Sequence, residues 1–161
     1  MSFEKRYSVI NFYVNGGSVV PQYGHGTSNL WKDMYAGKFT EEAKELFLKW
    51  AYEAETEVVL KGGDDESMEA LFADLQKLEG IPSAKFNEPA MRGTCTVVTF
   101  VAPDSLISAG HYIRGNRLTP FNAVQELTGK VIPHIDPTQG SFLLNDTEIA
   151  IISKLAFMPL A

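Results

Sequence analysis

The order in which short apolar runs alternate with amphipathic stretches constrains the fold of this chain more than any other feature. Strands are predicted where β-branched and aromatic residues gather, at 7–14, 57–61 and 94–101. Helices are predicted from Pro21 onward, after Thr40 and after Asp64, where start signals precede apolar residues spaced by three and four. The resulting order of strand, helix, helix, strand, helix, strand favours an α/β layered sheet.

The pattern after Ala102 is less regular. We expect a loop at 108–117, a short helix at 120–127, a proline-rich loop at 131–140, and a closing hairpin of 142–144 with 148–157. Because no repeat, low-complexity tract or long linker divides the chain, 1–161 is predicted to be a single domain. Its expected core is a mixed, mostly parallel sheet of about four to six strands with helices on both faces.

The charge of the chain limits the partners it can bind. With 14 basic and 20 acidic residues the formal net charge is -6, so the average field repels polyanions and a nucleic-acid contact needs a local patch. The single cysteine, Cys95, cannot form an internal disulfide, which favours a reducing cytosol. The sequence contains no apolar run of membrane-spanning length, and 1–10 lacks a signal-peptide core. We therefore expect a cytoplasmic protein that does not bind membranes.

Four segments then agree in order and spacing with one family. They are Gln22-Tyr23-Gly24-His25, Leu48-Lys49-Trp50, Val58-Val59-Leu60-Lys61 with its two glycines and acidic-capped helix, and Arg92-Gly93-Thr94-Cys95-Thr96-Val97-Val98. Together they resemble the type 2 peptidyl-tRNA hydrolases, small α/β enzymes of archaea and eukaryotes. The resemblance covers roughly 7–103 and is more specific for the fold than for the activity.

The resemblance implies hydrolysis of the ester that joins a peptide to the terminal ribose of tRNA. It implies neither a metal nor an organic cofactor. Such chemistry needs a positioned water, groups that stabilise an oxyanion, and contacts for phosphates. The implied ligand is the tRNA acceptor end or a nucleotide-like molecule. A homodimer is also compatible with the resemblance, because relatives of this fold often pair through the sheet or helices.

Four positions match the family's polar site residues. The resemblance places Gln22, His25, Thr96 and Glu88 in the catalytic set. The family's acidic residue falls on Asn87 or Glu88 depending on a gap, and only Glu88 keeps a carboxylate. The structural alternatives are a partly buried polar His25, an exposed Gln22 at the helix start and a Thr96 that only packs in its strand.

The turn before Gln22 departs from the family. There the family has a glycine- and lysine-rich turn that includes the lysine regarded as catalytic, whereas Asn15-Gly16-Gly17-Ser18 contains no lysine. Ser18 aligns with the last lysine, and its hydroxyl can hydrogen-bond but carries no charge. The backbone amides of Asn15, Gly16, Gly17 and Ser18 are a candidate phosphate cradle. The alternative is a plain turn.

Cations elsewhere are candidates to replace the missing lysines. The segment 104–147 is predicted to be a divergent insertion before a closing strand, and it carries Arg114 and Arg117 beside Tyr112. With Arg92 and Thr94 these arginines complete the predicted substrate-binding set. The alternative is that both pair with surface carboxylates.

Two functions follow from these observations. The first is a divergent peptidyl-tRNA hydrolase that cleaves this ester or a related nucleotide-linked ester. The second is a catalytically degenerate member of the same fold that engages a protein or small ligand through 104–147. No metal site is predicted, because His25, His111 and His134 fit no ligand pattern. Cys95 is predicted to be a small core residue rather than a nucleophile.

Overall fold

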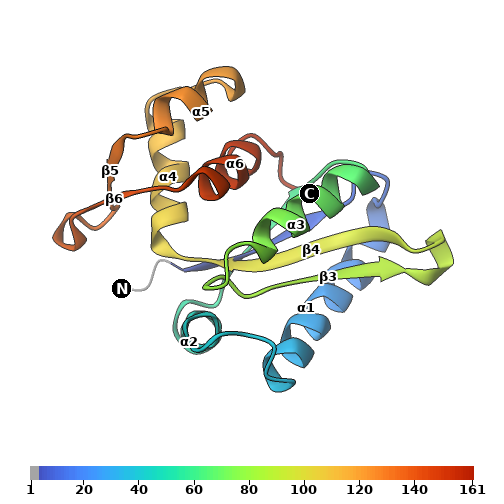
Figure 1. Cartoon of the computed structure of the whole chain (residues 1–161). Helices are drawn as coiled ribbons and strands as arrows, with labels where there is room; N and C mark the ends of the chain where they lie inside the picture. The colour runs from blue at the N-terminus through green and yellow to red at the C-terminus, as the bar shows by residue number, and fades with distance from the viewer. Residues whose placement is uncertain (1–3) are drawn as a thin grey trace.

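The computed structural model describes residues 4–161, and its central sheet has four strands in the order β2-β1-β4-β3 (Figure 1). The strands are β1 Lys5–Ile10, β2 Thr56–Lys61, β3 Ser83–Glu88 and β4 Thr94–Ala102. β1 is parallel to β2, whereas β4 is antiparallel to both β1 and β3. The predicted single α/β domain with a mixed sheet is confirmed.

The direction of the strands corrects one part of that prediction. The sheet is not mostly parallel, because one of its three strand pairs is parallel and two are antiparallel. The physical reason is a short turn, η3 Pro89–Met91, between β3 and β4, since only antiparallel neighbours can be joined so tightly. Strand β3 was not predicted from the apolar pattern, because its SAKFNE sequence alternates too weakly.

Helices cover both faces of the sheet, as expected (Figure 1). Under one face lie α1 Val19–Tyr35 and α2 Glu41–Lys49, which is followed by a π-helical turn, Trp50–Ala54. Over the other face lie α3 Asp65–Gln76, α4 Asp104–Gly115 and α6 Asp146–Leu155, with α5 Pro120–Leu127 packed on α6. None of the helices in the described part of the chain has the length and apolarity needed to cross a membrane.

The predicted helix starts on the N-terminal side of the chain are confirmed. Thr40 Oγ1 accepts a hydrogen bond from Ala43 N at 3.2 Å at the start of α2. Asp64 Oδ1 accepts from Ser67 N at 2.9 Å at the start of α3. Caps of this kind satisfy N–H groups that have no partner within the helix, so they position helix ends from local sequence.

The prediction of a loop at 108–117 is wrong, because α4 continues to Gly115. Its Ile107, Ala109 and Ile113 are buried in the core over the sheet. The two glycines of this stretch, Gly110 and Gly115, weaken the local helical signal. Burial of one helix face against the rest of the core outweighs that weak propensity.

The prediction of a closing hairpin is also wrong, because a helix, α6, rather than a strand begins at the end of the segment 104–147. Asn145 and Glu148 form a capping box at the start of α6, in which each side chain accepts a hydrogen bond from the other's backbone N–H at 2.8 and 3.0 Å. The short strand β6 Ser141–Leu143 instead pairs with β5 Val131–Pro133 across η4 Pro137–Gln139. The isoleucines of α6 favour a strand by composition, but the cap starts a helix.

Candidate active site

Three of the predicted catalytic residues form one hydrogen-bonded chain. Gln22 Nε2 donates to Glu88 Oε2 at 3.0 Å, and Thr96 Oγ1 donates to Gln22 Oε1 at 2.5 Å. Thr96 is fully buried and Gln22 is 8% exposed, so these bonds replace contacts with water. The amide of Gln22 therefore joins β4 to the end of β3, and it has one orientation because its two ends face different partners.

A bulge in the sheet directs the Thr96 side chain toward α1. Phe86 pairs with Val97 and Asn87 pairs with Cys95, which leaves Thr96 as the extra residue of β4. A bulge of this kind changes the direction in which a side chain points, and bulges recur beside active sites. Cys95 correspondingly lies in the core on the α3 side, as predicted, and burial raises the pKa of its thiol to about 12.

Glu88 lies at the end of β3 and caps the short turn that follows. Its Oε1 accepts a hydrogen bond from Ala90 N at 3.2 Å. The hydrogen bond from Gln22 lowers the pKa of Glu88 below its ordinary value, and the Ala90 N–H and the nearby His25 lower it further. The carboxylate is thus a permanent anionic acceptor at neutral pH.

His25 lies one helical turn after Gln22 on α1, at the exposed edge of the same site. Its ring stacks on Phe86 with centroids 4.2 Å apart and an interplanar angle of 19°. The neighbouring Gly26 brings the helix close to the sheet, because a Cβ there would lie 3.1 Å from Val97 Cγ1. A larger residue at 26 would push His25 and Gln22 away from the strands.

The Asn15–Ser18 turn leads directly into α1 and is exposed throughout. η1 covers Gly16–Ser18, and Gly16 has a φ of 54°, which suits glycine. Ser18 makes no side-chain cap to α1, so its hydroxyl is not used to start the helix. The turn therefore presents backbone and one hydroxyl beside Gln22, with no cationic side chain of its own.

The other predicted substrate-binding residues lie in two separate places. Arg92 and Thr94 lie at the turn between β3 and β4, close in sequence to Glu88, where Arg92 is exposed and Thr94 Oγ1 donates to Met91 O at 2.7 Å. Arg114 lines a hollow with Tyr7 on the face of the sheet opposite α1. Arg117 follows α4 at its far end from the sheet (Figure 1). The structure does not bring these two arginines to the site, because α4, which contains Arg114 and precedes Arg117, packs over the other face.

Residue Asn11 was missed, because it was counted within the predicted first strand. β1 ends at Ile10, and the fully buried Asn11 turns the chain: its Nδ2 donates to Cys95 O and its backbone N donates to Thr96 O, both at 3.0 Å. It therefore ties the loop after β1 to the site strand. The signal available was a polar side chain in an otherwise apolar run.

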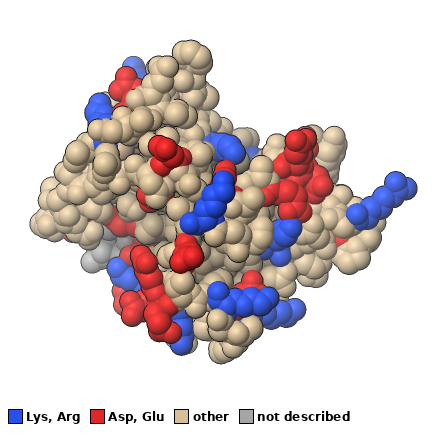
Figure 2. All heavy atoms as spheres, viewed as in Figure 1, with Lys and Arg blue, Asp and Glu red and all other residues tan. Residues whose placement is uncertain are grey.

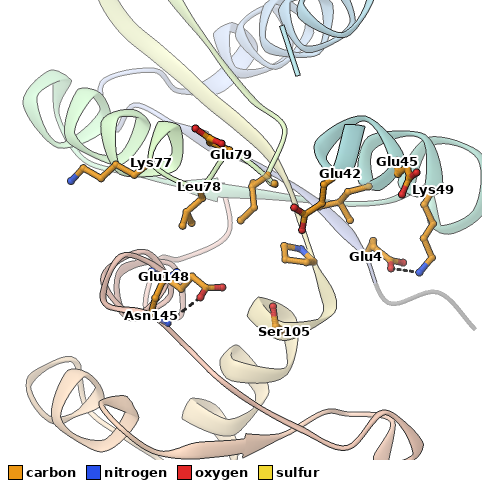
Figure 3. A pocket seen from close by; sticks show the side chains of 14 residues that line it. Glu4, Glu42, Glu45, Lys49, Lys77, Leu78, Glu79, Ser105, Asn145 and Glu148 are labelled. Atoms are coloured by element: carbon orange, nitrogen blue, oxygen red, sulfur yellow. Dashed lines mark hydrogen bonds and ion pairs between the residues drawn. The ribbon is translucent and has the colours of Figure 1, made fainter. Parts of the chain in front are cut away.

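A separate cavity of about 640 Å³ lies away from these residues, where α2, the end of α3 and the starts of α4 and α6 meet (Figure 3). Carboxylates outnumber lysines in its lining, which contains Glu4, Glu42, Glu45, Glu79 and Glu148 beside Lys49 and Lys77. Figure 2 shows further acidic side chains gathered over α3. Such surroundings repel phosphate, so this cavity is not the expected tRNA site. Within residues 4–161 no group of three or more His, Cys, Asp or Glu side chains is arranged to hold a metal ion.

Comparison with known proteins identifies the family. The family described as Peptidyl-tRNA hydrolase PTH2 matches residues 11–110, which span β3, β4 and the Gln22–Glu88–Thr96 chain. No curated protein matches the sequence. The match covers more than half of the chain and includes every residue that the hydrogen bonds bring together at this end of the sheet. The chain belongs to the peptidyl-tRNA hydrolase PTH2 family.

Proposed function

We propose that this protein hydrolyses the ester between a peptide and tRNA, or a related nucleotide-linked ester. The observation that carries the proposal is the chain of hydrogen bonds from Thr96 through Gln22 to Glu88, with His25 at its open edge, in a member of this family. The site holds the Glu88 carboxylate and the His25 imidazole near each other, and among the described residues these groups are not part of a set of metal ligands. Those two groups are sufficient to orient and deprotonate a water.

The reaction proceeds by attack of water on the ester carbonyl carbon. Glu88 accepts one hydrogen bond from the water, and His25 takes its proton as the carbon–oxygen bond forms. The bond between that carbon and the ribose oxygen then breaks, and His25 returns the proton to the ribose oxygen. The products are a free carboxylic acid and the ribose hydroxyl.

The Asn15–Ser18 turn supports the oxyanion in this scheme. The Gly16 and Gly17 N–H groups can donate to the developing negative charge, whereas the Ser18 and Val19 N–H groups already donate to Asn15 O and Gly16 O and Pro21 has no N–H. Ser18 Oγ is a further donor on the same turn. Arg92, exposed beyond Glu88, is the cation of the predicted set nearest in sequence to the catalytic carboxylate.

The test is single-turnover hydrolysis of peptidyl-tRNA by the full chain. We expect His25→Ala and Glu88→Gln to lower the rate by about a hundredfold or more, since positioned acid–base groups contribute at least that much. The control is His111→Ala, which alters an exposed histidine on α4. If the wild-type protein leaves peptidyl-tRNA intact while a lysine-containing relative cleaves it, the proposal fails.

A second candidate is a binding role without hydrolysis, in which 104–147 engages a protein. The observation that favours it is an exposed apolar surface on that segment: Phe121 is 85% exposed, and Val131 and Leu143, which pair across β5 and β6, are 62% and 60% exposed. Few charged side chains lie over this ribbon in Figure 2. Hydrolysis that depends on His25 would count against this candidate.

A further inference from the structure

Two exposed aromatic rings lie on the loop that follows β1. Phe12 is 39% exposed and Tyr13 is 66% exposed, and their ring centroids are 4.0 Å apart with an interplanar angle of 33°. Neither belongs to the apolar clusters of the core. We call these two side chains the aromatic pair. Two adjacent exposed rings bury little apolar area on folding, and exposed apolar surface of this kind indicates a binding role.

The backbone of the aromatic pair is anchored. Phe12 N donates to Gly63 O at 3.0 Å, and Tyr13 N donates to Asn11 Oδ1 at 3.0 Å. Val14 N closes the turn by donating to Asn11 O at 2.9 Å. Because Asn11 is itself buried and bonded to β4, the loop carries the rings in one place before any ligand binds. Such preorganisation lowers the entropy cost of binding.

Thr96 connects the aromatic pair to the candidate active site. Its carbonyl oxygen accepts from Asn11 N, and its hydroxyl donates to Gln22. The ends of β1 and β3 and the start of β4 meet at this edge of the sheet, because β4 is antiparallel to both neighbours. The aromatic pair therefore borders the place where the ester would be cleaved.

The charges at this edge argue against binding through phosphates alone. Asp64 and Asp65 begin α3 beside Gly63, and Asp65 Oδ1 accepts from Cys95 N at 2.6 Å. Lys61 ends β2 two residues before Gly63, so the cations here are matched by carboxylates. Stacking on an aromatic face needs no net charge, and every nucleobase offers a π face. A neutral stacking contact suits this edge better than a phosphate contact.

We propose that Phe12 and Tyr13 bind the unpaired nucleobase at the 3′ end of the substrate's nucleic acid by stacking. This inference rests on the proposed function and assigns the aromatic pair as binding residues, not catalytic residues. Stacking of the base supplies part of the binding energy that cationic side chains in the Asn15–Ser18 turn would otherwise supply. Binding through a base also predicts that affinity falls only shallowly with salt, because few counterions are released.

The test compares two short single-stranded RNAs, one ending in adenosine and one with an abasic 3′ residue, by fluorescence anisotropy with the full chain. We expect wild-type protein to bind the intact RNA at least about fivefold more tightly, since stacking one base contributes about 1–3 kcal/mol. The double variant Phe12→Leu, Tyr13→Leu should lose that preference. Neither RNA carries the ester, so the measurement is independent of hydrolysis.

The matched control is Tyr52→Leu, which removes an exposed tyrosine from the π-helical turn after α2. It should keep the preference for the intact RNA. The single variant Tyr13→Leu, at the more exposed ring, protects the test against misfolding of the double variant. Equal binding of the two RNAs by wild-type protein would overturn the stacking proposal even if hydrolysis is found. An intact preference in the folded Tyr13→Leu and double variants would overturn it as well.

Discussion

The polar contacts of the candidate active site join residues far apart in the sequence, whereas those of the segment 104–147 mostly join near neighbours. At the site, Gln22 bonds to Glu88 and Thr96, which are 66 and 74 residues away in the sequence. In 104–147 many polar contacts are local, such as Thr119 N to Asn122 Oδ1 and Thr138 N to Asp136 Oδ1. The polar contacts of the site thus depend on the whole sheet, whereas those of the segment are mostly local and its long-range contacts are apolar, through core residues such as Ile113 and Leu127.

One buried polar cluster within the segment joins residues far apart in the sequence. His134 Nδ1 is paired with Asp104 Oδ2, and Ile135 N donates to Ser108 Oγ at 2.9 Å. Asp104 and His134 are 13% and 15% exposed, so the pair attaches the β5–β6 ribbon to the start of α4. This contact lies on α4, away from Gln22. We therefore expect changes there to alter stability and changes at Gln22 to alter hydrolysis as well.

The largest effect is expected from Gln22→Leu. It leaves the buried Thr96 hydroxyl and one Glu88 oxygen without the amide, which should lower kcat/KM for peptidyl-tRNA about a hundredfold or more. Loss of a buried partner should also cost about 1–3 kcal/mol in the free energy of unfolding. Steady-state hydrolysis and urea unfolding measure the two effects. Gln125→Leu on the exposed side of α5 is the control, and an unchanged kcat/KM in Gln22→Leu would show that hydrolysis does not need this amide.

Asp104→Ala should destabilise the protein without changing hydrolysis. It removes the acceptor of His134 and of the Ser108 hydroxyl, and a loss of about 1–3 kcal/mol in the free energy of unfolding is expected. Urea unfolding with a parallel hydrolysis assay checks this. Asp146→Ala, an exposed first-turn residue of α6, should have a smaller effect. A large loss of kcat/KM in Asp104→Ala would show that the two regions are coupled.

Acid should weaken the site through Glu88. Because its pKa in the folded protein is lowered from 4.5, ionised Glu88 stabilises the fold above that value, and this contribution is lost as the pH falls through the lowered pKa. We expect the unfolding free energy of wild type to fall more steeply on acidification than that of Glu88→Gln, with parallel curves at neutral pH. Urea unfolding across a pH series tests this, with Glu126→Gln on α5 as control. Identical slopes in wild type and Glu88→Gln would contradict it.

The smallest effect is expected from Phe121→Ala on the exposed face of α5. Substitutions at such positions change stability by about 0.5 kcal/mol or less. The matched change Phe47→Ala, at a fully buried ring under the sheet, should cost about 3–5 kcal/mol. Thermal and urea unfolding compare the two. A large loss at Phe121 would mean that the ring is covered in solution, which sedimentation velocity would report as self-association.

Much of the candidate site could be predicted from the sequence. The family resemblance selected Gln22, His25, Glu88 and Thr96, and the structure brings Gln22, Glu88 and Thr96 into hydrogen-bonding contact with His25 beside them. Arg114 and Arg117 could not be placed, because their positions depend on which face of the sheet α4 covers. The anchoring role of Asn11 was hidden, because strand β1 ends one residue before it.

The sequence by itself determined those features that neighbouring residues encode. The caps at Thr40 and Asp64 and the apolar stripes that follow them locate α2 and α3, because a cap needs only residues within one turn. Only the tertiary structure decided that β4 runs antiparallel between β1 and β3 and that a bulge turns Thr96 toward Gln22. Those features depend on contacts between residues far apart in the chain, which no local pattern records.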